Sequence, residues 1–220
     1  MVEILAIVKP RSGGKRGGTG GVSANDIKST KSLVSAREGN QAMVDETLGV
    51  FREVEAEYGA VVTDIQLATM KKSSSAIAYY DSEGNIAINE KYFNKATMDT
   101  AYARCVESGF HPSNGNRTAL EAVVAHELGH KLTADIADRI GMNGFDGLHG
   151  AADKIVGEAM KSTKHKSSST FASKISGYAT HNAAETIAEA FSDVFCNGNK
   201  AKSESRAVVK VIDGYLKGAK

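Results

Sequence analysis

The chain is poor in cysteine, has no tryptophan, and contains no long apolar run. Its two cysteines, Cys105 and Cys196, stand far apart and outside any CxxC arrangement. They require no oxidising compartment, although the sequence leaves a single disulfide bond open. No stretch approaches the roughly 18 apolar residues that a membrane-spanning helix needs. We therefore expect no transmembrane segment and no membrane partner.

A secretory signal is also missing from the sequence. The first eight residues, MVEILAIV, are apolar, but they include Glu3, follow no basic residue, and lead to no small-residue cleavage site. The sequence therefore predicts a soluble protein that is cytoplasmic when it is synthesised.

Neither sign of charge is in excess, because 27 Lys and Arg nearly cancel 26 Asp and Glu. The chain as a whole therefore gives no electrostatic reason to expect a nucleic-acid partner. Residues 9–25 (KPRSGGKRGGTGGVSAN) depart from this balance, with four basic residues and six glycines. They hold almost no apolar surface that could offset their ordering entropy, so we predict a flexible basic linker. An arm that contacts nucleic acid or a capsid is the alternative interpretation.

With 220 residues and 41% hydrophobic content, the chain can bury one sizeable core. We divide it into a short apolar start with the basic linker (1–25), an N-terminal helical segment (26–59) and a main domain (60–220). Apolar periodicity and turn residues predict the elements within these parts. Helices are expected at 41–58, 119–134, 152–161, 183–195 and 203–217, and short strands at 61–68, 76–80 and 85–89. The polar run 161–170 (KSTKHKSSST) is expected to form an exposed, mobile excursion.

The helix expected at 119–134 carries the motif His126-Glu127-Leu128-Gly129-His130. Histidines four residues apart lie one turn apart on one face, so both imidazoles can reach a single Zn²⁺ at about 2.0–2.1 Å. Glu127 can take the proton from a water at the ion's open position and pass it to the leaving amine. Gly129 would leave room beside the ion. An exposed helix with two unremarkable histidines is the alternative, but the aliphatic residues around the motif favour a buried helix.

A catalytic zinc ion generally takes a third protein ligand. A third histidine of the HExxHxxGxxH kind is excluded, because position 136 is Ile136. The candidates further along the chain are His149, Asp153, Glu158, His165, His181, Glu185, Glu189 and Asp193. The glycine-rich and lysine-serine-rich surroundings of His149 and His165 favour roles outside the site. We expect His111 to pack in a loop at the rim of the site and His181 to lie near a helix start.

The stretch 177–191, GYATHNAAETIAEAF, carries the most information about the third ligand. An apolar stripe at helical spacing marks one side of its helix, and Glu185 and Glu189 project from the opposite side beside alanines. Small neighbours let a carboxylate face another helix closely, which favours a metal ligand. Asn182 and Glu185 also have the spacing of a helix cap and its third helical residue. A capping role for Glu185 therefore stays open.

Two motifs together resemble zinc peptidases of the gluzincin type. They are HELGH and a tyrosine seven residues before a glutamate, followed by Ala-Glu-Ala-Phe, here Tyr178, Glu185 and Ala188–Phe191. The segment Asn85–Phe93 (NIAINEKYF) also looks like the strand and turn that precede the active-site helix of such domains. The similarity covers roughly residues 60–197. It extends to the anthrax lethal factor catalytic domain and, more strongly, to the zincin-like domains of phage minor-head and head-morphogenesis proteins.

The resemblance implies an α+β zincin-like fold, with a small, largely antiparallel sheet, an active-site helix and a glutamate helix. It also implies one zinc ion per chain, held by His126, His130 and Glu185. Glu189 would then orient a ligating histidine, and Tyr178 would donate a hydrogen bond to the oxyanion.

The function implied is hydrolysis of a peptide or protein substrate, with Glu127 as the general base and then the acid. If the chain is phage-encoded, it would serve head assembly or maturation, contact capsid proteins and be associated with the virion. Two alternatives stay open. One is a non-catalytic virion or assembly protein with a structural zinc ion, and the other is a toxin-like effector protease.

Overall fold

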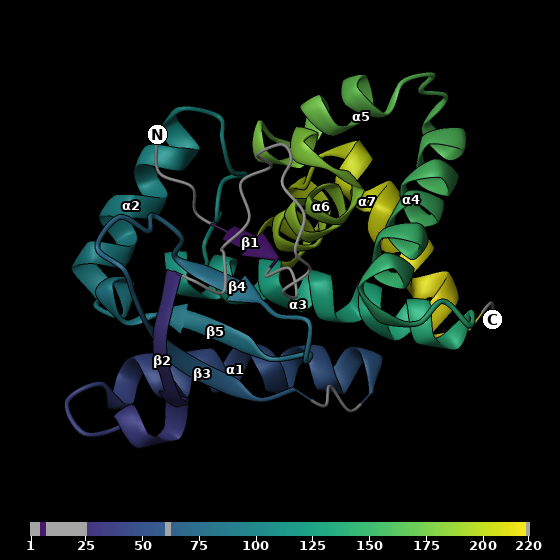
Figure 1. Cartoon of the computed structure of the whole chain (residues 1–220). Coiled ribbons are helices and arrows are strands. Elements are labelled where there is room, and N and C mark those ends of the chain that lie inside the picture. Colours follow the sequence, from purple (N-terminus) through teal and green to yellow (C-terminus); the bar gives the residue numbers. More distant parts are fainter. Residues whose placement is uncertain (1–4, 8–25, 60–62, 219–220) are drawn as a thin grey trace.

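The computed structural model describes residues 5–7, 26–59 and 63–218 (Figure 1). The linker predicted at 9–25 lies outside these residues. The strands are β1 (Leu5–Ile7), β2 (Ile27–Ser32), β3 (Ile65–Met70), β4 (Ala78–Tyr80) and β5 (Ile86–Asn89). The α-helices are α1 (Gln41–Tyr58), α2 (Lys95–Glu107), α3 (Ala119–Arg139), α4 (Gly144–Thr163), α5 (Ser168–Ile175), α6 (Ala183–Asn197) and α7 (Ser203–Leu216). Within the described ranges, no helix is long and apolar enough to cross a membrane.

The five strands form one mixed sheet in the order β1-β4-β5-β3-β2. Its outer pairs differ, since β1 pairs with β4 in parallel and β2 pairs with β3 antiparallel. In the middle, β4 and β5 are antiparallel, whereas β3 and β5 are parallel. The expectation of a largely antiparallel sheet was therefore wrong, although an α+β fold is confirmed. In the sheet, β5 lies between β4 and β3. Strand β3 therefore pairs with β5, in parallel, although β4 separates the two in sequence.

Alternation along the strands separates two apolar clusters. Ile86 and Ile88 of β5 belong to the main core, which the sheet shares with the helices, whereas Ala87 between them joins a smaller cluster with Tyr79. This period of two is the pattern of a strand whose successive side chains point to opposite faces. In Figure 1 the C-terminal helices, green to yellow, gather to one side of the sheet. Helix α3 connects the sheet with the C-terminal helices, because it contacts β4 and α1 as well as α6.

The three predicted strands correspond to β3, β4 and β5, and the predicted helices to α1, α3, α4, α6 and α7. Sequence periodicity missed β1, β2, α2 and α5, so the segment 26–59 predicted to be helical also contains a strand. The interpretation of 161–170 was wrong in part, because α4 continues to Thr163 and α5 begins at Ser168. The segment is mostly exposed, as expected. However, the Ser167 hydroxyl caps α5 by accepting from Thr170 N. Phe171, the first residue after this segment, is fully buried.

Candidate metal centre

Helix α3 carries His126, Glu127 and His130 through the core of the molecule. Its start is fixed by a capping box, in which Thr118 Oγ1 accepts from Glu121 N and the Glu121 carboxylate accepts from Thr118 N at 2.8 Å. The helix is buried on most of its circumference, and all five residues of the HELGH motif belong to its buried set. The alternative of an exposed helix with two unremarkable histidines is therefore excluded by the structure.

Helix α6 brings the second set of polar side chains against α3. Its start is capped by Asn182, whose side-chain oxygen accepts from Glu185 N at 2.9 Å. Glu185 and Glu189 follow one turn apart and are 3% and 1% exposed. Both carboxylates therefore face protein and not solvent.

Gly129 allows the close approach of α6 to α3. A Cβ atom at this position would lie 2.8 Å from Ala188 Cα and 3.2 Å from Phe191 Cβ. The expectation that Gly129 leaves room beside the metal was therefore wrong, because the space is taken by α6. Ala188 supplies the small neighbour that this contact also requires.

Three side chains converge where the two helices meet. Glu185 Oε2 lies 3.2 Å from His126 Nε2 and 3.4 Å from His130 Nε2. Among the described residues, His126, His130 and Glu185 form a group whose ligand atoms all lie within 4.8 Å of one another. The Glu185 carboxylate does not complete a capping box, because α6 shows only the Asn182 half of one. Its side chain therefore turns towards the histidines.

A second carboxylate holds the far side of His126. Glu189 Oε1 lies 2.8 Å from His126 Nδ1 and 2.8 Å from His111 Nδ1, and Ser176 Oγ donates to Glu189 Oε2 at 2.6 Å. An ionised carboxylate only accepts hydrogen bonds, so both histidines donate from Nδ1. This leaves His126 Nε2 as the nitrogen that faces Glu185. Although burial opposes ionisation, the charge and hydrogen bond of His111 and the bond from His126 lower the pKa of Glu189 to about 2.

His111 lies inside the site and not at its rim, which corrects the sequence-based expectation. It is only 3% exposed, and its ring stacks on Tyr102 with centroids 5.6 Å apart. The loop that carries it is fixed to the segment before α6, because Gly177 N donates to Gly109 O and Tyr178 N donates to Phe110 O. Sequence reasoning missed its contact with Glu189, because His111 lies 15 positions before the motif and no local pattern joins the two residues.

Glu127 follows His126 directly on α3. It is fully buried, and neither carboxylate oxygen has a hydrogen-bond partner in the described part of the chain. Burial raises its pKa to about 8, although the nearby charge of His126 lowers it. His126 shows the opposite outcome: burial lowers its pKa, but hydrogen bonds to Glu185 and Glu189 outweigh burial and raise the value to about 10.

Tyr178 lies in the 3₁₀ turn η4 (Tyr178–His181) just before α6 and is 1% exposed. Its ring centroid is 6.0 Å from that of His126, so it borders the centre. His149 is close enough for its charge to act on His130, whose pKa is lowered mainly by burial. His181 is exposed at the end of the same turn, near the start of α6 as expected.

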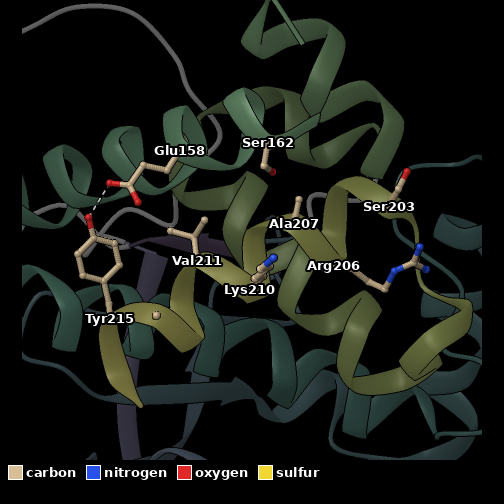
Figure 2. Close-up of a pocket in the computed structure, with 9 residues that line it drawn as sticks. Glu158, Ser162, Ser203, Arg206, Ala207, Lys210, Val211 and Tyr215 are labelled. Carbon is tan, nitrogen blue, oxygen red and sulfur yellow. Dashed lines mark hydrogen bonds between the residues drawn. The ribbon is translucent and has the colours of Figure 1, made fainter. Parts of the chain in front are cut away.

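The remaining candidates for the third ligand have other partners or lie in solvent. His165 pairs with Glu204 at 3.0 Å, and Glu158 accepts from Tyr215 Oη at 2.7 Å (Figure 2). Asp193 accepts from Ser205 Oγ and Lys202 N, which joins α6 to α7. Asp153 is exposed. None of these four belongs to the cluster of ligand atoms found in the described residues.

The convergent atoms fit a zinc ion. Two nitrogens and one carboxylate oxygen are donors that Zn²⁺ accepts, and tetrahedral ligands about 2.0–2.1 Å from an ion lie about 3.3 Å from one another. The two distances from Glu185 Oε2, 3.2 and 3.4 Å, agree with that spacing. In addition, both ring nitrogens of His130 are buried without a hydrogen-bond partner within the described structure, and Nε2 is the one that faces Glu185 Oε2.

Comparison with known proteins identifies one family. The family described as peptidase family M48 matches residues 45–216, well over half of the chain. No curated protein and no solved structure matches the chain. The match confirms the resemblance to zincin-like metallopeptidases, but it does not confirm the resemblance to phage head domains or to anthrax lethal factor. With its HExxH helix and its cluster of histidine and glutamate ligand atoms, the chain belongs to peptidase family M48, a family of zinc-dependent metallopeptidases.

Proposed function

We propose that this metallopeptidase binds one zinc ion through His126, His130 and Glu185 and hydrolyses peptide bonds with Glu127 as its general base. The observation that carries the proposal is the convergence of the three ligand atoms next to the buried Glu127 carboxylate, which has no hydrogen-bond partner among the described residues. The family match supports peptidase activity. The residue roles are our assignment, made from the geometry of α3 and α6.

When bound, zinc would act as a Lewis acid on the substrate carbonyl and make water more acidic. The protein's own part in the chemistry is to move the proton. Glu127 follows His126 on α3, and both of its carboxylate oxygens are buried without a hydrogen-bond partner among the described residues. The carboxylate is therefore free to accept a proton from the attacking water and then to deliver it to the leaving amine.

Two further groups would prepare the site before substrate arrives. Glu189 accepts from Nδ1 of His126, which fixes the ring and leaves Nε2 free to ligate, and His111 and Ser176 hold Glu189 in place. Tyr178, buried beside His126, is our candidate for a donor to the oxyanion that forms on the substrate.

The sheet supplies a docking surface for the substrate backbone. Strand β4 contacts α3, and the ring of Tyr80 at its end stacks on His130 with centroids 6.3 Å apart. A peptide that adds to this strand in extended form would run past the metal ligands. We therefore propose that the substrate is an extended segment of a peptide or protein.

A structural zinc site is the second candidate, and the burial of the centre favours it. His126, Glu127 and His130 are at most 1% exposed, as in sites that hold a metal only to stabilise a fold. In that case Glu127 would have no proton to move.

Replacement of Glu127 by glutamine separates the two candidates. Glu127→Gln is expected to keep the fold and one equivalent of zinc, because the residue is not a ligand. Its amide cannot accept the proton from water, so hydrolysis should fall by roughly 10²–10⁴-fold. The assay uses zinc-loaded protein with a mixed peptide library, and a chelator serves as the control. Equal cleavage by the variant, or no cleavage by the unmodified zinc-loaded protein, would refute the peptidase mechanism.

A further inference from the structure

The strand next to the metal centre has both of its sides occupied by the chain itself. On its inner side β4 pairs with β5, with Tyr80 opposite Ile86. On its outer side it pairs in parallel with β1, with Leu5 opposite Ala78 and Ile7 opposite Tyr80. Figure 1 shows β1 as the small purple arrow beside β4. Within the described chain, β1 is therefore the outermost strand at the end of the sheet that borders the centre.

This outer side of β4 is the side that a peptide substrate would need. Strand β5 pairs with the inner side of β4 in a continuous antiparallel ladder. The backbone groups of β4 can therefore accept an added strand only on the side where β1 now lies. The position is close to the chemistry, because the Tyr80 ring stacks on His130 and α3 contacts β4.

The centre is closed in this arrangement. Glu127 and His130 are both 0% exposed, and the two Glu127 oxygens have no hydrogen-bond partner in the described part of the chain. A reacting carbonyl has to come within about 3–3.5 Å of the attacking group, which a fully buried carboxylate does not permit. Part of the protein must therefore move before a peptide can enter.

We infer that residues 5–7 are an internal ligand of the peptide-docking edge: they occupy the outer side of β4 and must leave before a substrate peptide can take their place. The inference rests on the proposed function, because it takes that edge as the docking surface. The occupant is an extended backbone, which is what an exposed strand edge binds, and it belongs to this chain. Three residues supply few ladder hydrogen bonds, so they can be displaced. Their covalent attachment keeps the effective concentration of this ligand at about the millimolar level.

An internal ligand of this kind acts as a competitive inhibitor. It raises the apparent KM, because substrate must displace it, and it leaves kcat unchanged, because the saturated enzyme no longer contains it. The test is a full-length variant with Leu5→Pro, Ala6→Pro and Ile7→Pro together, which removes every N–H donor of β1. The apparent KM should fall at least threefold with unchanged kcat. An apparent KM equal to that of the unmodified protein overturns the inference.

The matched control places the same three prolines elsewhere in the N-terminal segment, as Ser12→Pro, Gly13→Pro and Gly14→Pro. This control should keep the KM of the unmodified protein. Circular dichroism and the thermal midpoint verify that both variants are folded. A similar fall of KM in the control would show that the effect does not come from β1, and it would also overturn the inference.

A binding measurement makes the inference independent of turnover. A fluorescent peptide with the sequence of residues 2–9, VEILAIVK, is titrated with zinc-loaded Glu127→Gln protein, with or without the prolines at residues 5–7. We expect at least threefold tighter binding, by fluorescence anisotropy, when the prolines are present, because loss of the internal ligand changes KM and peptide affinity by the same factor. Selective binding without any hydrolysis in the library assay would support the internal ligand and reject the proposed function. Hydrolysis together with equal peptide binding by both proteins would support the proposed function and reject the internal ligand.

Discussion

Glu185 combines two roles that the sequence could not separate. Its backbone N–H is bound by the Asn182 cap, whereas its carboxylate lies between His126 and His130. The N–H contact belongs to the helix, and the carboxylate contact belongs to the metal centre. Because the two contacts use different atoms, substitutions can test them one at a time.

Glu185→Ala should abolish stoichiometric zinc binding at micromolar metal, because it removes one of three protein ligands while the backbone N–H stays capped. Asn182→Ala should lower the free energy of unfolding by roughly 0.5–2 kcal/mol, the usual effect of losing a cap, and retain one equivalent of zinc. Metal content after gel filtration and urea unfolding measure the two effects. Full zinc binding by Glu185→Ala would disprove its assignment as a ligand.

His111 acts on the centre through Glu189, because Nδ1 of His111 and Nδ1 of His126 both contact Oε1 of Glu189. His111→Leu should weaken zinc binding by roughly 10–100-fold, the usual effect of losing a partner that orients a ligand. His111→Gln, which can still donate to Glu189, should recover part of the affinity. Competition with a chelator measures both variants, and His181→Leu, at an exposed position of the neighbouring turn, is the control. Equal losses in the leucine and glutamine variants would show that only packing matters.

At the scale of elements, the contact between α3 and α6 decides whether the ligands meet. This contact has almost no tolerance at Gly129, where a Cβ atom would lie 2.8 Å from the backbone of Ala188. A helical glycine normally costs about 1 kcal/mol relative to alanine. Here that cost is offset by the close approach that brings Glu185 to the two histidines.

Gly129→Ala should therefore destabilise the protein by roughly 1–3 kcal/mol, because overpacking outweighs the gain in helix propensity. It should also weaken zinc binding, since α6 would have to move away from α3. Gly49→Ala is the matched control, because Gly49 lies inside α1 and a Cβ there would meet no atom within 4 Å. This control should stabilise the protein by up to about 1 kcal/mol. Urea unfolding of both variants measures the difference, and equal stabilities would contradict the assignment of Gly129 as a packing position.

At the scale of the whole molecule, α1 packs into the same core as the helices of the metal centre. Val44, Val50, Phe51 and Val54 of α1 are all buried there. Arg117, just before α3, also donates to Glu53 of α1 and to Glu121 of α3. The predicted boundary between a helical segment at 26–59 and a domain at 60–220 therefore cuts through one shared core, and truncation at this boundary tests it.

A chain that begins at residue 60 should fail to fold. Each buried aliphatic or aromatic side chain of α1 contributes about 1.5–3 kcal/mol, and together they approach the 5–15 kcal/mol that stabilises a whole domain. A chain that begins at residue 26 retains α1 and β2 and is the control, expected to unfold cooperatively. Circular dichroism and thermal melting distinguish the two. A cooperative transition in the shorter chain would show that residues 60–220 form a domain by themselves.

The sequence alone determined those features that depend on local spacing. The interval of four between His126 and His130 places both histidines on one helical face wherever that helix lies. Likewise, the alanines beside Glu185 and Glu189 indicated a helix that meets another element closely. The α+β class and the helices that carry the site could be predicted for the same reason, because periods of 2 and 3.6 residues express themselves within a few neighbouring residues.

The tertiary structure alone decided which distant groups meet. It placed His111 on Glu189 and filled the space at Gly129 with α6, and it joined β1 to β4 and β3 to β5 in parallel. Each of these contacts links residues that are far apart in sequence, and parallel strands always need such a crossover. Their formation depends on the packing of the whole core, so no local pattern records them. The residues of the HExxH helix can therefore be predicted from the sequence, whereas the side chains and strands that enclose them follow only from the fold.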